Sequence, residues 1–201
     1  MFDRKGCVMP EAFDWEILHR PSAMAMVRGQ LGFSWMVLSG RLARLTDEEY
    51  FWRPSAEALT VVRRHYAGRY RPLGSGEWVA QWPDEPDHRG PRTIAWLIAH
   101  LTETFFERWE WTFGPRQQGR SDITLHGNAR DAVAWLTHWV ESWQQAIAAL
   151  SEDEVLTVGL SQATELDAAE PFGHVVLRLN RELIHHGSEI MTLQDLYGVA
   201  A

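Results

Sequence analysis

The chain has 201 residues, of which 45% are hydrophobic and 23% are charged, and its net charge is −8. This acidic balance argues against nucleic acid as a partner, because phosphate binding needs a concentrated basic surface. No stretch approaches the roughly 18 apolar residues of a membrane-spanning helix, and the N-terminal residues lack the apolar core of a signal peptide. Cys7 is the only cysteine, so an internal disulfide cannot form and a reducing cytoplasm is expected.

We expect residues 1–201 to form one domain, in which residues 1–20 are a partly ordered lead-in. The first long helix is predicted over residues 22–45, where apolar residues recur at helical spacing. A short helical turn should follow, because Thr46 precedes a run of acidic residues in the pattern of a capping box.

Residues 55–90 show no helical period. Gly76–Trp82 alternates as a short strand does, and the β-branched run from Leu59 to His65 offers a partner for a hairpin. We expect this segment to be a small irregular excursion over one end of the helices. Trp78 and Trp82 could close a pocket there, although packing on the nearest helix is the more common fate of such side chains.

Three further long helices are predicted over residues 93–112, 129–150 and 171–197. The last helix should begin at Pro171, which suits a first turn, and end before Gly198. An acidic connector with a short extended piece at residues 155–160 precedes it. The predicted fold is all-α: a four-helix bundle with a long irregular connection between its first and second helices.

One position of the last predicted helix is unusual for a core. The apolar seam of this helix runs through Leu179, Leu183 and Ile190, and His186 stands where another apolar residue is expected. Glu182 lies one turn earlier on nearly the same face. Burying a carboxylate and an imidazole together is costly unless something compensates them, and a metal ion is the obvious candidate.

A third candidate ligand, His100, stands beside the apolar stripe of the second long helix. Two imidazoles and one carboxylate suit Zn²⁺, Ni²⁺ or Fe²⁺, and three protein ligands leave positions open for water or substrate, as in catalytic sites. We therefore predict a divalent metal site formed by His100, Glu182 and His186. By spacing, the candidate acceptors for the imidazole N–H groups are Glu103, Glu189 and Asn180.

Each of these assignments has a simpler alternative. A histidine in an apolar stripe is usually a core residue with a hydrogen bond, and a glutamate four residues before a histidine is often a surface pair. His185 competes with His186, because it also shares a face with Glu182, but only His186 falls in the apolar seam. The remaining histidines lie in predicted loops or on polar faces and are not expected to be ligands: His19, His65, His88, His126, His138 and His174.

A family resemblance is carried by two segments: residues 93–114, TIAWLIAHLTETFFERWEWTFG, and residues 179–198, LNRELIHHGSEIMTLQDLYG. Together they resemble the DinB/YfiT-like family of metal-dependent enzymes. The resemblance implies a four-helix bundle with one metal ion and three ligands, commonly histidines. His100 matches the ligand in an H-L context, and His186 matches the second histidine of the last helix. Glu182 replaces the first, as in the branch resembling mycothiol-dependent maleylpyruvate isomerase, which implies zinc and a low-molecular-weight thiol.

The leading hypothesis is a metal-dependent enzyme that activates mycothiol or another low-molecular-weight thiol for transfer to an electrophilic small molecule, as an S-transferase or isomerase. Arg178 and Arg181 flank Glu182 and could hold an anionic group, although a solvated helix face is the more common role. Metal-assisted hydrolysis by water and a non-enzymatic, stress-associated metal-binding bundle are the alternatives. An exposed apolar side on one helix would make a homodimer reasonable.

Overall fold

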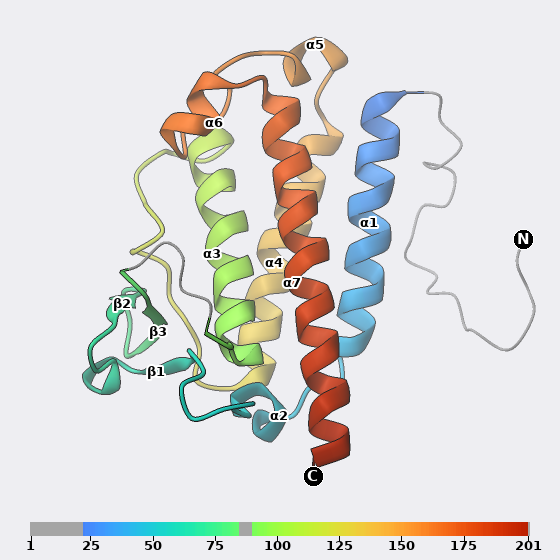
Figure 1. Cartoon of the computed structure of the whole chain (residues 1–201). Coiled ribbons are helices and arrows are strands. Elements are labelled where there is room, and N and C mark those ends of the chain that lie inside the picture. Colours follow the sequence, from blue (N-terminus) through green and yellow to red (C-terminus); the bar gives the residue numbers. More distant parts are fainter. Residues whose placement is uncertain (1–21, 85–89, 201) are drawn as a thin grey trace, which may run out of the picture.

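The computed structural model describes residues 22–84 and 90–200 (Figure 1). The lead-in expected at residues 1–20 lies outside these ranges. Also outside them are Cys7, His19 and His88. The described chain is mostly helical, with seven α-helices and one three-stranded sheet. The sheet corrects the expected all-α class, and its strands come from the segment at residues 55–90, where β-branched and aromatic residues favour extended backbone.

Four long helices make up most of the structure: α1 (Ala23–Leu42), α3 (Ile94–Thr112), α4 (Ala129–Ala148) and α7 (Phe172–Ala200). Their bounds lie close to the predicted ranges. Ser22, Thr93 and Asn128 each accept a hydrogen bond from a backbone N–H in the first turn of α1, α3 and α4, respectively. The end predicted at Gly198 is wrong: α7 continues to Ala200, since glycine lowers helix propensity without blocking a helix.

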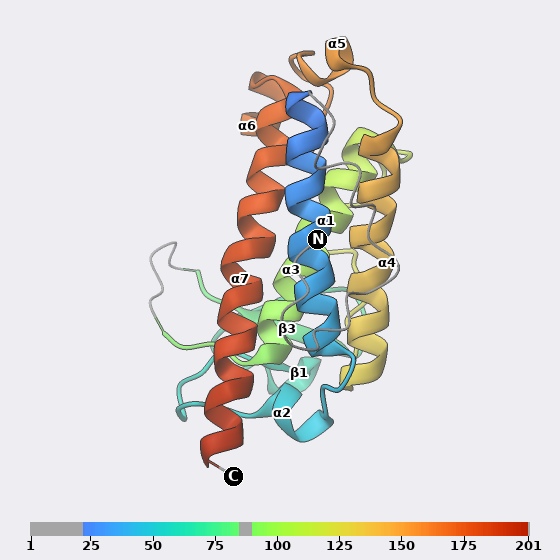
Figure 2. The same ribbon diagram turned by 90° about the vertical axis from the view of Figure 1, so that its right-hand side faces the viewer.

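The four long helices lie side by side (Figures 1 and 2). α3 contacts α4 and α7, and α1 contacts the same two helices. The colours of Figure 1 show that α3 and α4 run in one direction and that α1 and α7 run in the opposite one. Between them lies a connected cluster of buried apolar side chains that includes Phe105, Trp143 and Phe172. No helix within the two described ranges combines the length and apolar character that crossing a membrane requires.

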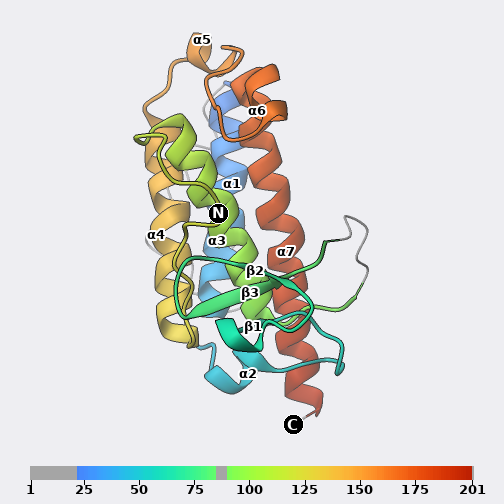
Figure 3. The same cartoon turned by 90° about the vertical axis from the view of Figure 1, so that its left-hand side faces the viewer.

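The sheet lies over the N-terminal part of α3 (Figure 3). Its strands, β1 (Val61–Arg63), β2 (Arg71–Leu73) and β3 (Trp78–Trp82), are antiparallel in the order β1-β3-β2. β3 confirms the predicted strand. It is tied to α3 because the Trp96 indole N–H donates to the Gln81 carbonyl oxygen at 2.8 Å. This bond holds the end of β3, and with it Trp82, against α3.

Three short α-helices and one 3₁₀ turn complete the described elements: α2 (Asp47–Phe51), η2 (Arg64–Tyr66), α5 (Glu152–Val155) and α6 (Glu165–Ala169). The capping box predicted at Thr46 is present. The extended piece predicted at residues 155–160 is wrong at its start: a second capping box, formed by Ser151 and Glu154, begins α5, and Val155 is the last residue of that helix. Within this stretch, Val158 forms an isolated β-bridge with Pro171.

The connection from α3 to α4 is shaped by the shared direction of these two helices. Residues 113–128 return along α3 before α4 begins (Figure 3). Acidic side chains of α3 hold this loop, since the Glu110 carboxylate accepts from the backbone N–H groups of Gln117 and Gln118 at 2.8 and 3.2 Å. Glu107 accepts from the Arg120 backbone N–H at 3.4 Å. The loop therefore brings Arg120 beside α3.

Gly127 lies where this loop meets the sheet, and a side chain there has no room. A Cβ atom on Gly127 would lie 2.0 to 2.4 Å from atoms of the Trp78 indole, so Gly127→Ala must displace that ring. We expect Gly127→Ala to lower the free energy of unfolding by about 1–3 kcal/mol in urea denaturation. Gly76→Ala is the matched control, because its Cβ would meet only Thr124, at 3.8 Å. Equal stability of Gly127→Ala and the wild type would contradict this packing.

Candidate metal centre

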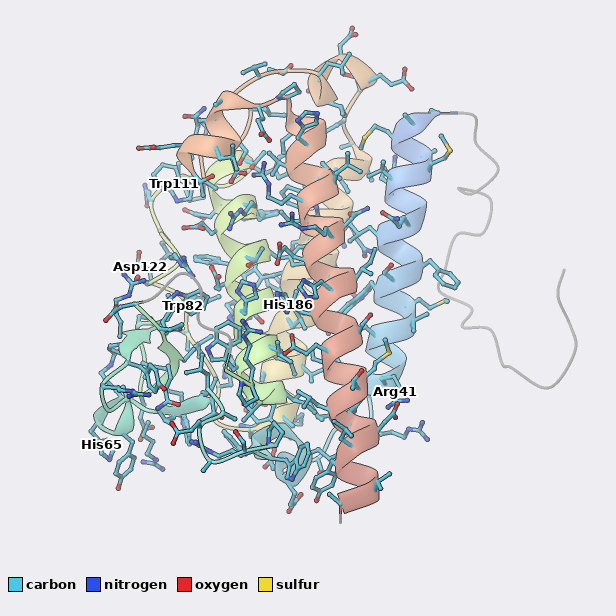
Figure 4. All side chains as sticks on the ribbon, viewed as in Figure 1. Arg41, His65, Trp82, Trp111, Asp122 and His186 are labelled. Carbon is cyan, nitrogen blue, oxygen red and sulfur yellow. The ribbon has the colours of Figure 1, made fainter. Side chains whose placement is uncertain are left out.

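His100 on α3 and Glu182 and His186 on α7 converge between the two helices. Figure 4 shows His186 on the side of α7 that faces α3. The Glu182 Oε2 atom lies 3.6 Å from His100 Nε2 and 3.3 Å from His186 Nε2. One nitrogen or oxygen atom from each residue lies within 4.8 Å of the other two. The structure therefore brings together the three residues that the sequence pattern selected.

A second carboxylate holds each imidazole from its other side. His100 Nδ1 lies 3.1 Å from Glu103 Oε1, and His186 Nδ1 lies 3.2 Å from Glu189 Oε2. A carboxylate only accepts hydrogen bonds, so each Nδ1 carries a proton and donates it. Both Nε2 atoms then face Glu182, as in metal sites where a carboxylate orients a ligating histidine. Two of the three acceptors predicted by spacing are thus in place.

This arrangement sets three acceptors opposite one another. With no cation among them, the two Nε2 lone pairs and the Glu182 carboxylate repel, unless each imidazole takes a second proton. Burial lowers the pKa of His100, but its hydrogen bonds with Glu103 and Glu182 outweigh burial and raise that pKa. The pKa of His186 is raised in the same way, by Glu182 and Glu189 against burial. The hydrogen bonds with His100 and His186 hold the pKa of Glu182 well below its usual range.

A single divalent cation would also remove the repulsion among the two Nε2 lone pairs and the Glu182 carboxylate. Two neutral imidazoles and one carboxylate are ligands that bind borderline divalent ions, and three protein ligands leave a position open for another molecule. Arg181 adds to the fit, because its Nη2 donates to Glu182 Oε1 at 2.6 Å and leaves Oε2 facing the histidines. The donor set therefore fits a divalent metal ion.

A pocket begins at His100 and Glu182 and is also lined by Trp82. The Trp82 indole stacks on Trp96 with ring centres 5.1 Å apart, and both rings lie beside the imidazole of His100, at 5.7 and 5.3 Å. Figure 4 shows Trp82 on the sheet side of α3. Three arginines also line the pocket: Arg108, Arg120 and Arg178.

Several residues proposed from the sequence lie elsewhere. Asn180 does not reach the histidines, because its side-chain amide donates to a backbone carbonyl of α1 at 2.9 Å. His185 is exposed, and its ring stacks on His186 without joining the cluster. Trp78 packs on Phe51, so only Trp82 of the two tryptophans lines the pocket. Four other described histidines also lie outside the cluster: His65, His126, His138 and His174.

Sequence reasoning missed two charged residues of the pocket, Arg108 and Arg120. The Arg120 Nη2 atom donates to Glu103 Oε1 at 3.1 Å, and its guanidinium carbon lies 4.3 Å from the centre of the Trp82 ring. Arg120 belongs to a polar loop, which gave no signal. Arg108 did give a sequence signal, because it occupies a position in the buried stripe of α3 where an apolar residue is expected.

Comparison with known proteins identifies a family and no individual relative. A family model described as the DinB superfamily matches residues 30–190. No curated protein and no solved structure matches the chain. The matched range contains all three residues of the cluster and the three arginines of the pocket.

The orientation of His186 can be tested through Glu189. Glu189→Gln keeps the size of the side chain but replaces the charged acceptor of the Nδ1 proton with a neutral one. We expect the zinc affinity, measured by competition with a chromophoric chelator, to fall roughly 10–100-fold. Glu141→Gln, at an exposed position of α4, is the matched control. An unchanged affinity in Glu189→Gln would show that this carboxylate does not orient the imidazole.

Proposed function

The chain belongs to the DinB superfamily, and from this premise we propose that it is a metal-dependent enzyme whose divalent ion is held by His100, Glu182 and His186. The observation that carries the proposal is the convergence of two Nε2 atoms and one carboxylate oxygen, each oriented by a partner of its own. We further infer that the ion is zinc. The four long helices would form a single four-helix-bundle domain around it, with the sheet segment as the long connection.

We propose that the reaction uses a low-molecular-weight thiol such as mycothiol. Glu182 in place of a histidine supports this, because the His-Glu-His pattern resembles the branch of mycothiol-dependent maleylpyruvate isomerase. When bound, a divalent ion lowers the pKa of a coordinated thiol, so that the thiolate forms at neutral pH. The substrate would be an electrophilic small molecule, which is either joined to the thiol sulfur or isomerised with the thiol as cofactor.

The residues of the chain then act by orienting donors and limiting solvent. Glu103 and Glu189 keep a proton on each Nδ1, which leaves both Nε2 atoms available as ligands. Arg181 holds one oxygen of Glu182 and leaves the other for the centre. Trp82 covers the sheet side of His100 and keeps water from that side of the pocket.

Removal of one ligand should abolish metal binding. We expect chelator-treated protein to bind about one equivalent of zinc and to gain about 2.7 kcal/mol in free energy of unfolding at about 100 times the dissociation constant. His186→Ala should lose both the zinc, measured by elemental analysis, and the accompanying rise in melting temperature. His185→Ala is the matched control, because His185 is next to His186 in the chain but is exposed and lies outside the cluster. An unchanged zinc content in His186→Ala would contradict the proposed metal centre.

The thiol is tested by turnover. We expect the zinc-loaded protein to conjugate a chromogenic electrophile, followed by absorbance, only when mycothiol or bacillithiol is present, because the centre activates sulfur. The reaction should be lost in His186→Ala and retained in His185→Ala. Hydrolysis of ester substrates without added thiol would favour a metal-assisted hydrolase. Absence of any turnover, combined with a large loss of melting temperature in chelator, would favour a non-enzymatic role.

A further inference from the structure

Three arginines from different elements line the pocket beside the metal centre. Arg108 comes from α3, Arg120 from the loop between α3 and α4, and Arg178 from α7. Their side chains are only 15%, 35% and 19% exposed. Buried guanidinium groups are strongly destabilising unless carboxylates or bound anions compensate them. The position of the carboxylates that pair with these arginines therefore indicates whether the pocket can also bind an anion.

The carboxylates that pair with Arg108 and Arg178 lie behind the pocket wall. Both arginines pair with Asp167 of α6, which is fully buried. Arg108 also pairs with Glu107 at 3.1 Å, and Arg178 with Glu170 at 2.5 Å. The described residues that line the pocket include both guanidinium groups and none of these three acids. At this end of the pocket, Arg108 and Arg178 therefore present their guanidinium groups, while the described acids that line the pocket are Glu103 and Glu182 of the metal centre.

Each of the three guanidinium groups keeps a nitrogen that other described residues leave unused. These atoms are Arg108 Nη2, both Nη1 and Nε of Arg120, and Arg178 Nε. Arg108 Nε lies 3.3 Å from Asp167 Oδ2 as an ion pair but makes no hydrogen bond to a described residue. The acids behind the wall hold Arg108 and Arg178 in place, and Glu103, which lines the pocket, holds Arg120, so little conformational freedom is lost when a ligand binds. Guanidinium groups held in this way match the planar geometry of a carboxylate.

We propose that Arg108, Arg120 and Arg178 form an anion subsite, which binds a carboxylate of the same small molecule that reaches the metal centre. This inference rests on the proposed function and adds a substrate class to it. Arg178 precedes Glu182 by four residues, and Arg108 follows His100 by eight. The carboxylate should therefore lie about 6–12 Å along the helix axes from the metal-binding group of the ligand.

A purely structural role is the competing explanation, in which the arginines only tie α6 to α3 and α7. That role accounts for Arg108 and Arg178 through Asp167. It does not account for Arg120, which among the described residues makes no hydrogen bond or ion pair with α6 and pairs instead with Glu103, the partner of His100. Arg120 extends the positively charged wall toward the metal end of the pocket.

The test uses two hydroxamates that bind zinc through the same group: suberic acid monohydroxamate, which ends in a carboxylate, and its analogue that ends in a neutral carboxamide. Calorimetry measures the affinity of each for the zinc-loaded protein. We expect the carboxylate probe to bind about ten-fold more tightly or better, with a smaller ratio at high salt. Arg178→Gln and Arg120→Gln should each reduce this preference. Arg130→Gln, at a 91% exposed side chain of α4, should keep it.

Zinc binding is measured first without either probe, so that a failure of the proposed metal centre can be distinguished from a failure of the anion subsite. Equal affinities of the two hydroxamates for the zinc-loaded wild type would overturn the anion subsite and leave the metal centre intact. A wild type that binds no zinc would overturn the proposed function and this inference with it. Arg178→Gln removes a partner of buried Asp167 and can unfold the protein, so Arg120→Gln decides. A full preference in folded Arg120→Gln would overturn the three-arginine subsite.

Discussion

The buried carboxylate of Glu103 is the group on which the arrangement of the site depends. It accepts hydrogen bonds from His100 Nδ1 and from the guanidinium group of Arg120, so a single side chain orients an imidazole of α3 and anchors the loop beside it. Burial raises the pKa of Glu103, but the hydrogen bond with His100 and the charge of Arg120 outweigh burial and lower it. Because Glu103 stays charged, His100 keeps its proton on Nδ1 and turns Nε2 toward α7.

The shared direction of α3 and α4 explains how a loop residue becomes part of this site. The connection between the two helices has to pass along α3, and Glu103, Glu107 and Glu110 each make a hydrogen bond to it. The last contact on this path sets Arg120 against Trp82 of β3. Sheet, helix and loop, which follow one another in the chain, therefore meet at one pocket.

Local sequence was enough to predict the long helices, because helical spacing and capping depend on residues within a few positions of one another. The grouping of His100 with Glu182 and His186 drew on the family resemblance as well. His186 interrupts an apolar seam, and this exception is visible without a structure. The remaining features depend on contacts between distant segments. Asn180 and Glu189 are both plausible partners by spacing, yet Asn180 bonds to α1. Arg120 has no local pattern at all, since its position follows from the path of the loop.

The long stretch of chain between His100 and Glu182 has a consequence for the order of folding. The sheet, α3 and the loop can associate while α7 is still being synthesised, and Glu103 then already has Arg120 as a partner. His100 has no facing ligand until α7 packs against α3. The site is thus completed by contacts of high sequence separation, which form late. Metal binding would therefore report that α7 has packed, and a nascent chain lacking α7 would have Glu103 paired with Arg120 but lack two of the three proposed ligands.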